Sequence, residues 1–177
     1  SSLRTGERAN ARIRNTASML WVVYLLLSSF CFLGLTLLGM NFYDALTHTL
    51  TSVSTAGFSP HNESIAYFKN PGVKIFLCLI MLMSSLSFLL YVSLIQGKWK
   101  RFKIEEEARF FIAVIFIALT LILFNFTVQN SNPLGTPLVD DIFQIISILT
   151  TSGYVTVDYN QWPSFSIAAL LILMLMG

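Results

Sequence analysis

The sequence predicts an all-α integral membrane protein built from two similar units in tandem. Of its 177 residues, 55% are hydrophobic and only 11% are charged, and the mean hydropathy is +0.70. A globular domain carries about 25% charged residues, so this composition excludes an ordinary soluble domain. Long uncharged segments alternate with short polar ones, and two glycine-containing loops of the same pattern lie 96 positions apart.

The chain opens with a basic segment that leads into the first predicted span. Arg4, Arg8 and Arg12 are spaced so that a helix places them along one face. We expect a solvated basic flank there and not a nucleic-acid-binding segment. Residues 18–40 carry no charge and exceed the about 20 residues that cross a hydrocarbon core, and Trp21 suits the interfacial aromatic belt. This run is too long for the core of a signal peptide, so no cleavable signal is predicted.

Residues 42–53 mix polar and apolar side chains and predict a short helix. About a dozen residues make a helix of roughly 18 Å, which is too short to span a bilayer. Asn41 suits an N-cap, and Asp44 in the first turn favours the positive end of the helix dipole, so Asp44 is assigned as a cap. The loop at residues 54–59 then predicts a re-entrant segment, since irregular backbone at membrane depth must be surrounded by protein or water.

Two histidines and two cysteines are expected to have structural roles and not to bind metal or form a disulfide. His48 lies on the short helix, where we expect hydrogen-bonded packing. His61 lies in the polar loop 60–71 without a clustered ligand beside it, so we expect a solvated side chain and no metal. Cys31 and Cys78 lie in apolar runs, so we expect each to pack and do not expect a disulfide.

The rest of the chain repeats the same order of elements. Residues 73–96 predict the second span, and the charged residues 98–109 form a linker, so the two units are expected at residues 1–97 and 110–177. The second unit contains a span at 110–128, a short helix at 137–149, a filter-like loop at 150–155, and an apolar run at 163–177 that is too short to complete a crossing.

An offset of 96 positions relates the two units. It separates Gly57 from Gly153, and it separates Asp44 from Asp140, which is therefore assigned the same capping role. Parallel repeats around an axis normal to the membrane are a known plan for channels and transporters. The same offset pairs Thr55 with Thr151, Phe58 with Tyr154, Leu46 with Ile142, and Leu50 with Ile146.

Both loops have the features of an ion-selectivity filter. Each contains small polar residues, a glycine and an aromatic residue. A filter aligns backbone carbonyls to replace the hydration shell of a cation, and glycine adopts the required backbone angles at little cost. The partial negative charge at the C-terminal ends of the two short helices also favours a cation. The proposed ligands are the backbone carbonyls of Thr55, Ala56, Gly57, Thr151, Ser152 and Gly153, with Phe58 and Tyr154 packed behind them.

The distribution of basic residues predicts the orientation of the chain. Nine of the eleven Lys and Arg residues lie before the first span or between the second and third, and only Lys69 and Lys74 lie on the other side. The positive-inside rule therefore places the N-terminal segment and residues 98–109 in the cytoplasm. An even number of crossings separates these two segments, so the assignment is self-consistent.

These residues resemble a known family. The chain is similar to the TrkH/KtrB/HKT superfamily of potassium transporters, and most closely to its TrkH branch, over essentially its whole length. The family resembles four fused copies of a two-span potassium-channel subunit, of which this chain would hold the second and third. The match is carried by Thr55-Ala56-Gly57-Phe58-Ser59 with His61, by residues 64–68, and by Thr150-Thr151-Ser152-Gly153-Tyr154 with Trp162-Pro163.

The resemblance implies potassium uptake across the cell membrane, either channel-like or ion-coupled, with K⁺ as the transported ion. It implies that the chain is part of a longer protein and that Gly177 lies where the third unit breaks into a gating loop. The expected partners are the lipid bilayer, the remaining pore units, a second copy in a homodimer and a cytoplasmic nucleotide-binding regulatory ring. The expected location is a bacterial inner membrane.

Two other functions are weighed against this one. A non-transporting assembly or sensor subunit of the same fold stays open, although the doubled glycine loop argues against it. An intramembrane aspartyl protease, suggested by Tyr43-Asp44, requires two carboxylates that share a site within the spans. Asp44 and Asp140 instead lie at helix starts, where capping explains them, and no Gly-X-Gly-Asp motif follows. We therefore do not expect an enzyme.

Overall fold

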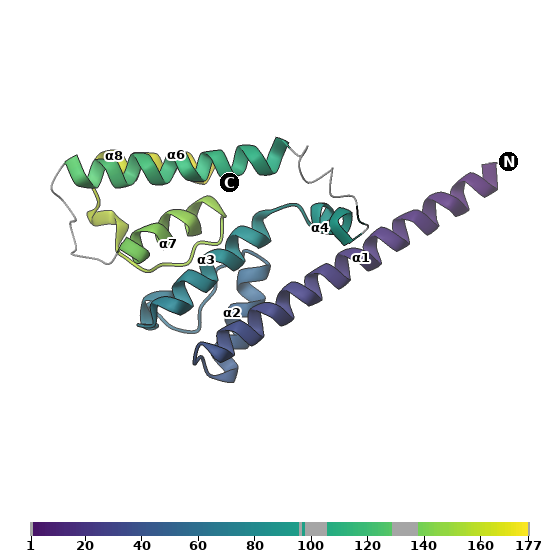
Figure 1. Cartoon of the computed structure of the whole chain (residues 1–177), viewed down its shortest axis with the longest axis horizontal. Helices are drawn as coiled ribbons and strands as arrows, with labels where there is room; N and C mark the ends of the chain where they lie inside the picture. Colours follow the sequence, from purple (N-terminus) through teal and green to yellow (C-terminus); the bar gives the residue numbers. More distant parts are fainter. Residues whose placement is uncertain (1, 96, 98–105, 129–137, 177) are drawn as a thin grey trace.

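The protein is an all-α arrangement of helices joined by loops and 3-10 turns (Figure 1). The computed structural model describes residues 2–95, 97, 106–128 and 138–176, and no strand occurs among them. The predicted all-α class is confirmed. Helix α1 extends from the N terminus along one side of the molecule, and α6 and α8 lie along the other (Figure 1).

The first unit packs around α1 (Ser2–Leu37). Helices α2 (Phe42–Val53), α3 (Pro71–Ser85) and α4 (Phe88–Ile95) all contact α1, and α2 also contacts α3. The 3-10 turn η1 (Ser64–Tyr67) lies in the loop between α2 and α3. Buried apolar side chains fill the space between these elements, among them Cys31, Leu35, Ala45, Leu77 and Met81.

The second unit places α7 (Leu138–Leu149) against both of its longer helices. These are α6 (Glu106–Val128) and α8 (Ser164–Met176), which also contact each other. The turn η2 (Tyr159–Gln161) precedes α8. Helix α7 additionally packs on α3 of the first unit, so α3 contacts both short helices, α2 and α7 (Figure 1). The core of this unit includes Ile122, Ile145, Leu149, Trp162 and Leu170.

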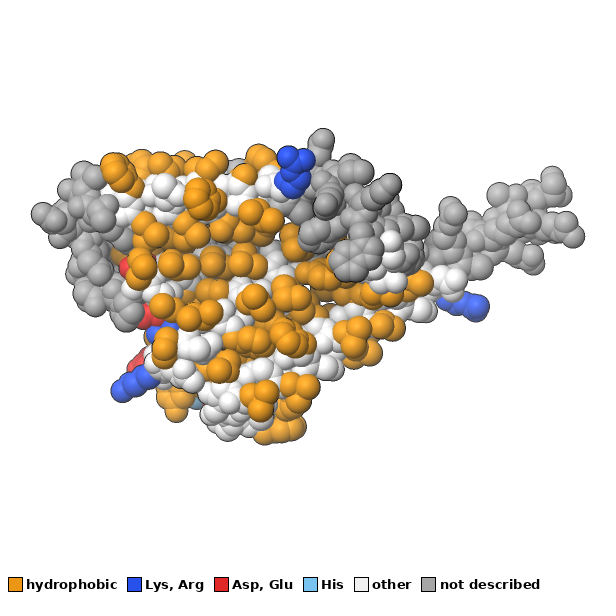
Figure 2. All heavy atoms as spheres, viewed as in Figure 1, with side chains coloured by type: hydrophobic (Ala, Val, Ile, Leu, Met, Phe, Trp, Pro, Cys, Tyr) orange, Lys and Arg blue, Asp and Glu red, His pale blue; other side chains and the backbone are white. Residues whose placement is uncertain are grey.

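The outer surface is apolar, which suits a lipid environment. Figure 2 shows hydrophobic side chains over most of the described surface of one face. A patch of this extent marks contact with a membrane or another protein. Within the described residues, the segment Arg14–Leu37 is long and apolar enough to cross a membrane. The shorter apolar helices are Pro71–Ser85, Arg109–Asn125 and Ser164–Leu175.

The predicted span at 73–96 is not a single helix, because the structure interrupts it between α3 and α4. Leu86 adopts an extended conformation with φ −76° and ψ 146°. The Ser85 hydroxyl donates to a carbonyl of the preceding turn, a bond that competes with helical backbone bonding. The Tyr91 hydroxyl donates to the carbonyl of Met83 at 2.6 Å, which satisfies a group that the interruption leaves without a helical partner.

The linker also differs from the expectation at its C-terminal end. Helix α6 begins at Glu106, so residues 106–109 are helical and belong to that helix. Residues 98–105 of the linker lie outside the described residues, as do Pro137 at the expected start of the second short helix and Gly177.

A buried ion pair joins the two units. The Lys74 ammonium, in the first turn of α3, lies 2.5 Å from a carboxylate oxygen of Asp140 in the first turn of α7. The two side chains are only 11% and 10% exposed. Removing one member of a buried pair leaves the other charge without compensation, so this contact ties α3 to α7.

We predict that Lys74→Met lowers the free energy of unfolding by about 3–5 kcal/mol, because Asp140 is left buried and unpaired. Thermal unfolding of the detergent-solubilised full-length protein measures the change. The double variant Lys74→Met/Asp140→Leu should recover most of the loss. Lys69→Met, which removes an exposed lysine from the loop just before α3, is the control. A Lys74→Met protein as stable as the control would show that the pair contributes little.

Candidate functional site

The first glycine loop folds back onto the end of its own short helix. The backbone N–H groups of Ala56 and Gly57 both donate to the carbonyl of Thr51, at 2.8 and 3.3 Å. The N–H of Thr55 donates to the carbonyl of Ser52 at 3.2 Å. The last carbonyls of a helix have no partners within the helix. The N–H groups of the loop therefore serve as donors to these last carbonyls, and they point toward α2.

The second loop closes α7 in a related way. The N–H of Thr151 donates to the carbonyl of Ile148 at 3.0 Å, and the N–H of Gly153 donates to that of Ser147 at 3.1 Å. These five N–H groups of the two loops therefore point back to the helices. In a filter this orientation is required, because the carbonyls must face the ion.

Backbone angles repeat between the two loops. Thr55 and Thr151 have φ values of 51° and 57°, and Gly57 and Gly153 have φ values of 66° and 78°. A positive φ is uncommon for a residue with a side chain. Its occurrence at both equivalent threonines shows that the 96-residue repeat extends to the backbone conformation. Each threonine hydroxyl donates to the carbonyl before it, at 2.8 and 2.7 Å.

The six carbonyls proposed as ligands have no hydrogen-bond donor among the described residues. Among the described residues, none of the carbonyl oxygens of the six accepts a hydrogen bond. A backbone carbonyl at membrane depth requires a partner, and water or a cation is the alternative to protein. The six residues are Thr55, Ala56, Gly57, Thr151, Ser152 and Gly153.

The two loops are in backbone contact with each other. A Cβ atom added to Gly57 would overlap the carbonyl oxygen of Ser152 and lie 3.3 Å from the carbonyl carbon of Gly153. A Cβ atom added to Gly153 would have no heavy atom within 4 Å. Gly57 is therefore required both for its backbone angle and for the close approach of the second loop, whereas Gly153 is required for its angle alone.

Tyr154 packs behind the second loop, on the short helix of the first unit. Its side chain is fully buried, and its hydroxyl lies 2.6 Å from the Thr51 hydroxyl and 3.0 Å from the Ser52 hydroxyl. The Thr51 hydroxyl donates to the carbonyl of Thr47, so it accepts from Tyr154, which leaves Ser52 to donate to the tyrosine oxygen. This hydroxyl cluster, Thr51, Ser52 and Tyr154, locks the two units together beside the loops.

Phe58, the equivalent of Tyr154, is 74% exposed. Within the described residues Phe58 is not buried behind the first loop, and its packing there stays a prediction for the full-length protein. The reason lies in the geometry of the repeat: Tyr154 packs on the helix of the preceding unit and not on α7. Phe58 has no equivalent helix beside it among the described residues.

The residue that caps α2 is Asn41, which corrects the assignment to Asp44. The Asn41 carboxamide oxygen accepts from the N–H of Asp44 at 2.8 Å, and its NH₂ group donates to the Asp44 carboxylate at 2.9 Å.

The environments of His61 and Asp140 also differ from the expectation. His61 lies 3.0 Å from the other carboxylate oxygen of Asp44, and its ring stacks on that of Tyr67 with the centroids 3.8 Å apart, so it is not the solvated side chain that we expected. Asp140, likewise assigned as a cap, lies in the first turn of α7 and pairs with Lys74.

His48 links α2 to the outer end of the first loop. Its Nδ1 atom lies 2.7 Å from the carbonyl of Asp44 and must donate there, because a carbonyl only accepts. Its Nε2 atom therefore accepts from the Ser59 hydroxyl, at 3.1 Å. The ring is fully buried. The structure confirms the predicted hydrogen-bonded packing, and the described residues contain no group of three ligating side chains for a metal.

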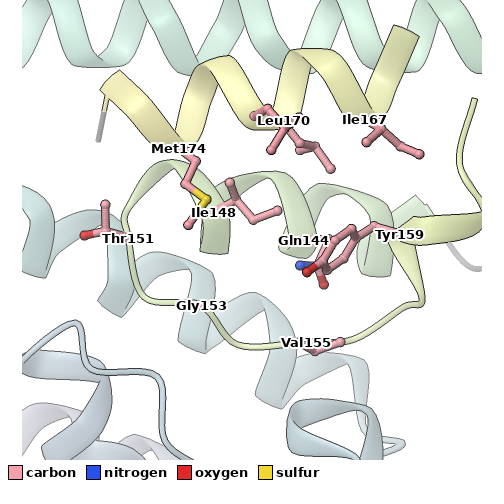
Figure 3. A pocket seen from close by; sticks show the side chains of 10 residues that line it. Gln144, Ile148, Thr151, Gly153, Val155, Tyr159, Ile167, Leu170 and Met174 are labelled. Carbon is pink, nitrogen blue, oxygen red and sulfur yellow. The ribbon is translucent and has the colours of Figure 1, made fainter. Parts of the chain in front are cut away.

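A cavity of about 310 Å³ lies between α7, the second loop and α8 (Figure 3). Two of its lining residues, Gln144 and Ile148, are the equivalents of His48 and Ser52 in the repeat. The cavity thus occupies the face of α7 that corresponds to the face of α2 on which Tyr154 packs. Its other lining residues are Thr151, Gly153, Val155, Tyr159, Ile167, Leu170, Leu171 and Met174.

Two short helices that end in glycine loops with unpaired carbonyls, inside an apolar-surfaced helical chain, define a pore-loop membrane protein. The comparisons with known proteins agree with this class. The model of the TrkH family, described as a cation transport protein, matches residues 2–177, and the chain belongs to the TrkH family.

The similar proteins include several potassium uptake proteins. The Trk system potassium uptake protein TrkH of Escherichia coli K12 is 34% identical over 93% of this chain, and TrkG of the same strain is 32% identical over 94%. The crystal structure of the potassium transporter TrkH from Vibrio parahaemolyticus covers 92% of the chain with a TM-score of 0.81 and 28% identity. The chain spans about a third of these proteins: 35%, 34% and 36% of their lengths.

We predict that Tyr154→Phe lowers the free energy of unfolding of the full-length protein by about 1–3 kcal/mol, because a buried Ser52 hydroxyl loses its partner. Thermal unfolding in detergent measures the effect. The control is Tyr67→Phe, which removes the hydroxyl from a half-exposed ring and preserves its stacking on His61. Equal stability of the two variants would contradict the role assigned to the hydroxyl cluster.

Proposed function

We propose that the full-length protein takes up potassium through a filter to which this chain contributes two of the strands. The observation that carries the proposal is the set of six backbone carbonyls, in two loops of matching conformation, that accept no hydrogen bond among the described residues. Carbonyl rings of this kind replace the hydration shell of K⁺. No catalytic side chain takes part.

The two short helices add electrostatic support. Each loop follows the C-terminal end of α2 or α7, where the helix macrodipole contributes about half a negative charge. Helix α7 is largely buried and α2 is buried along one face, so protein replaces part of the water that would screen their fields. A cation in front of the loops is therefore favoured over an anion. The similar proteins are potassium uptake proteins, which supports K⁺ as the cation.

The filter would be completed by further pore units of the same polypeptide. The described chain has two open sites at which such units fit by the symmetry of the repeat. A preceding unit would cover the exposed Phe58, as α2 covers Tyr154. A following unit would place its own filter residue in the cavity beside Gln144 and Ile148. Gly177 is proposed as the start of a gating loop.

The location and the other partners follow from charge and family. We place the protein in a bacterial inner membrane, with the N-terminal segment and the linker at 98–109 on the cytoplasmic side, as the positive-inside rule requires. A homodimer and a nucleotide-binding regulatory ring are proposed partners. Lys98, Lys100, Arg101 and Lys103 would lie near the ring, or else contact anionic lipid headgroups. Neutralising all four and measuring the salt dependence of ring binding distinguishes these two roles.

We predict that Gly57→Ser and Gly153→Ser each reduce the K⁺/Na⁺ selectivity of uptake by about tenfold, because a side chain in the left-handed region costs about 1–2 kcal/mol and displaces the carbonyls. Gly57→Ser should be the more severe, since its side chain also meets the second loop. Uptake of K⁺ and Na⁺ by the full-length protein in proteoliposomes gives the ratio.

The matched control is Gly39→Ser. Gly39 has a φ of +94° and open space around it, so it carries the same backbone strain but lies outside the loops. Its variant should keep the normal selectivity. Unchanged selectivity in both filter variants would refute the assignment. A wild-type protein that moves no K⁺ at all would favour the non-transporting subunit.

A further inference from the structure

The outer end of the second loop is held by a turn of the first unit. The backbone N–H groups of Ile65 and Ala66 both donate to the carbonyl of Val155, at 3.1 and 3.2 Å. In return, the N–H of Val155 donates to the Ser64 hydroxyl oxygen at 3.2 Å. Both backbone groups of Val155 are therefore bonded to η1, which lies about 90 positions earlier in the sequence, since Ser64 and Val155 are separated by 91.

Ser64 adopts an unusual conformation to make this contact. Its φ is 52°, in the left-handed region that non-glycine residues seldom occupy. Its N–H donates to the carbonyl of His61 at 2.9 Å, which fixes the turn. Strained backbone angles persist only where the surrounding contacts determine them, so the contacts of η1 fix the backbone of Ser64.

The contact of Val155 with η1 is a second attachment of the loop to the first unit, beside the hydroxyl cluster formed by Tyr154. Tyr154 is bonded through its hydroxyl to Thr51 and Ser52 of α2, and Val155 is bonded through its backbone to η1. Tyr154 and Val155 are the next two residues after Gly153, whose carbonyl is a proposed ligand. The outer half of the second loop is thus positioned by the first unit from two sides.

The first loop has a different attachment at the corresponding place. The equivalent of Val155 is Ser59, which bonds to His48 of its own unit. The equivalent of Ser64 is Asn160, whose side chain donates to Asp158 within the same turn. The attachment through η1 therefore belongs specifically to the second loop among the described residues.

We propose that Ser64 is a positioning residue for ion selectivity: its hydroxyl and the two N–H groups after it hold Val155 so that the carbonyls of Ser152 and Gly153 keep the spacing that suits K⁺. We call the set Ser64, Ile65, Ala66 and Val155 the η1 clamp. Na⁺ is smaller and needs the carbonyls to move inward, which a fixed Val155 opposes. The proposal rests on the proposed function, since it assigns a control of selectivity to the same filter.

The test removes the Ser64 hydroxyl in two variants that differ in backbone strain. Ser64→Ala deletes the acceptor and keeps the strained angle, whereas Ser64→Gly deletes the acceptor and relieves the strain. Ser64→Asn retains an acceptor and tolerates a positive φ, so it serves as the rescue. Asn160→Ala, at the equivalent position of the other unit, is the control. All are made in the full-length protein and assayed in proteoliposomes for the K⁺/Na⁺ ratio and for the maximal rate of K⁺ uptake.

We expect both Ser64→Ala and Ser64→Gly to lower the K⁺/Na⁺ ratio about fivefold, the factor given by one net hydrogen bond, while the maximal rate of K⁺ uptake changes little. Ser64→Asn and Asn160→Ala should keep the normal ratio. Hydrogen exchange at the Val155 amide should be faster in the first two variants by a similar factor.

The outcomes separate this proposal from the one on which it rests. A wild-type protein that takes up no K⁺ overturns both. A selective wild-type protein whose Ser64→Ala and Ser64→Gly variants keep the normal ratio overturns the role of Ser64 alone. Equal loss of K⁺ and Na⁺ uptake in Ser64→Gly also overturns it, because a purely structural contact would act on both ions alike.

Discussion

The arrangement depends on one constraint: backbone polar groups at membrane depth must be bonded inside the protein unless an ion or water replaces that bond. In the two glycine loops, the N–H groups of Thr55, Ala56, Gly57, Thr151 and Gly153 bond to carbonyls in the last turns of α2 and α7. The six carbonyls proposed as ligands accept no hydrogen bond from the described residues. This division of donors and acceptors leaves carbonyls available for a cation, and it accompanies the left-handed threonines and glycines of the two loops.

The two units are related by a repeat but are fastened by different chemistry. Asp44 bonds to His61 of its own unit, whereas Asp140 bonds to Lys74 of the neighbouring one. The position equivalent to Lys74 is Leu170, which lines the cavity beside α7 and has no charge. The repeat therefore preserves backbone geometry in the loops and allows side chains around them to diverge.

Much of the fold could be predicted from the sequence, because hydropathy and helix length are local properties. The uncharged run at 18–40 and the short segment at 42–53 correspond to helices in the structure. The break at Leu86 was missed, since a lone serine cluster in an apolar run does not specify where a helix ends. Asn41 and Asp44 both suit a helix start, so residue type alone does not show that Asn41 caps α2 while Asp44 bonds to Asn41 and His61.

The contacts between units were less accessible to sequence reasoning. The 96-residue offset identified Tyr154 and Phe58 as equivalents, but their burial depends on which helix lies beside each one. Ser64 carried no sequence feature that predicts a left-handed angle, since glycine or asparagine is the usual residue there. Lys74 could have been suspected, because a charge at the edge of an apolar helix often has a buried partner.

The attachment of the second loop to the first unit has a consequence for the order in which the chain acquires its structure. The hydroxyl of Tyr154 reaches partners 103 and 102 positions earlier in sequence. Closing so long a segment costs entropy before any contact forms, and such non-local contacts form slowly. During synthesis, α2 and η1 emerge first and can serve as a template. The second loop is then shaped against a finished surface, so its conformation is a late product of folding.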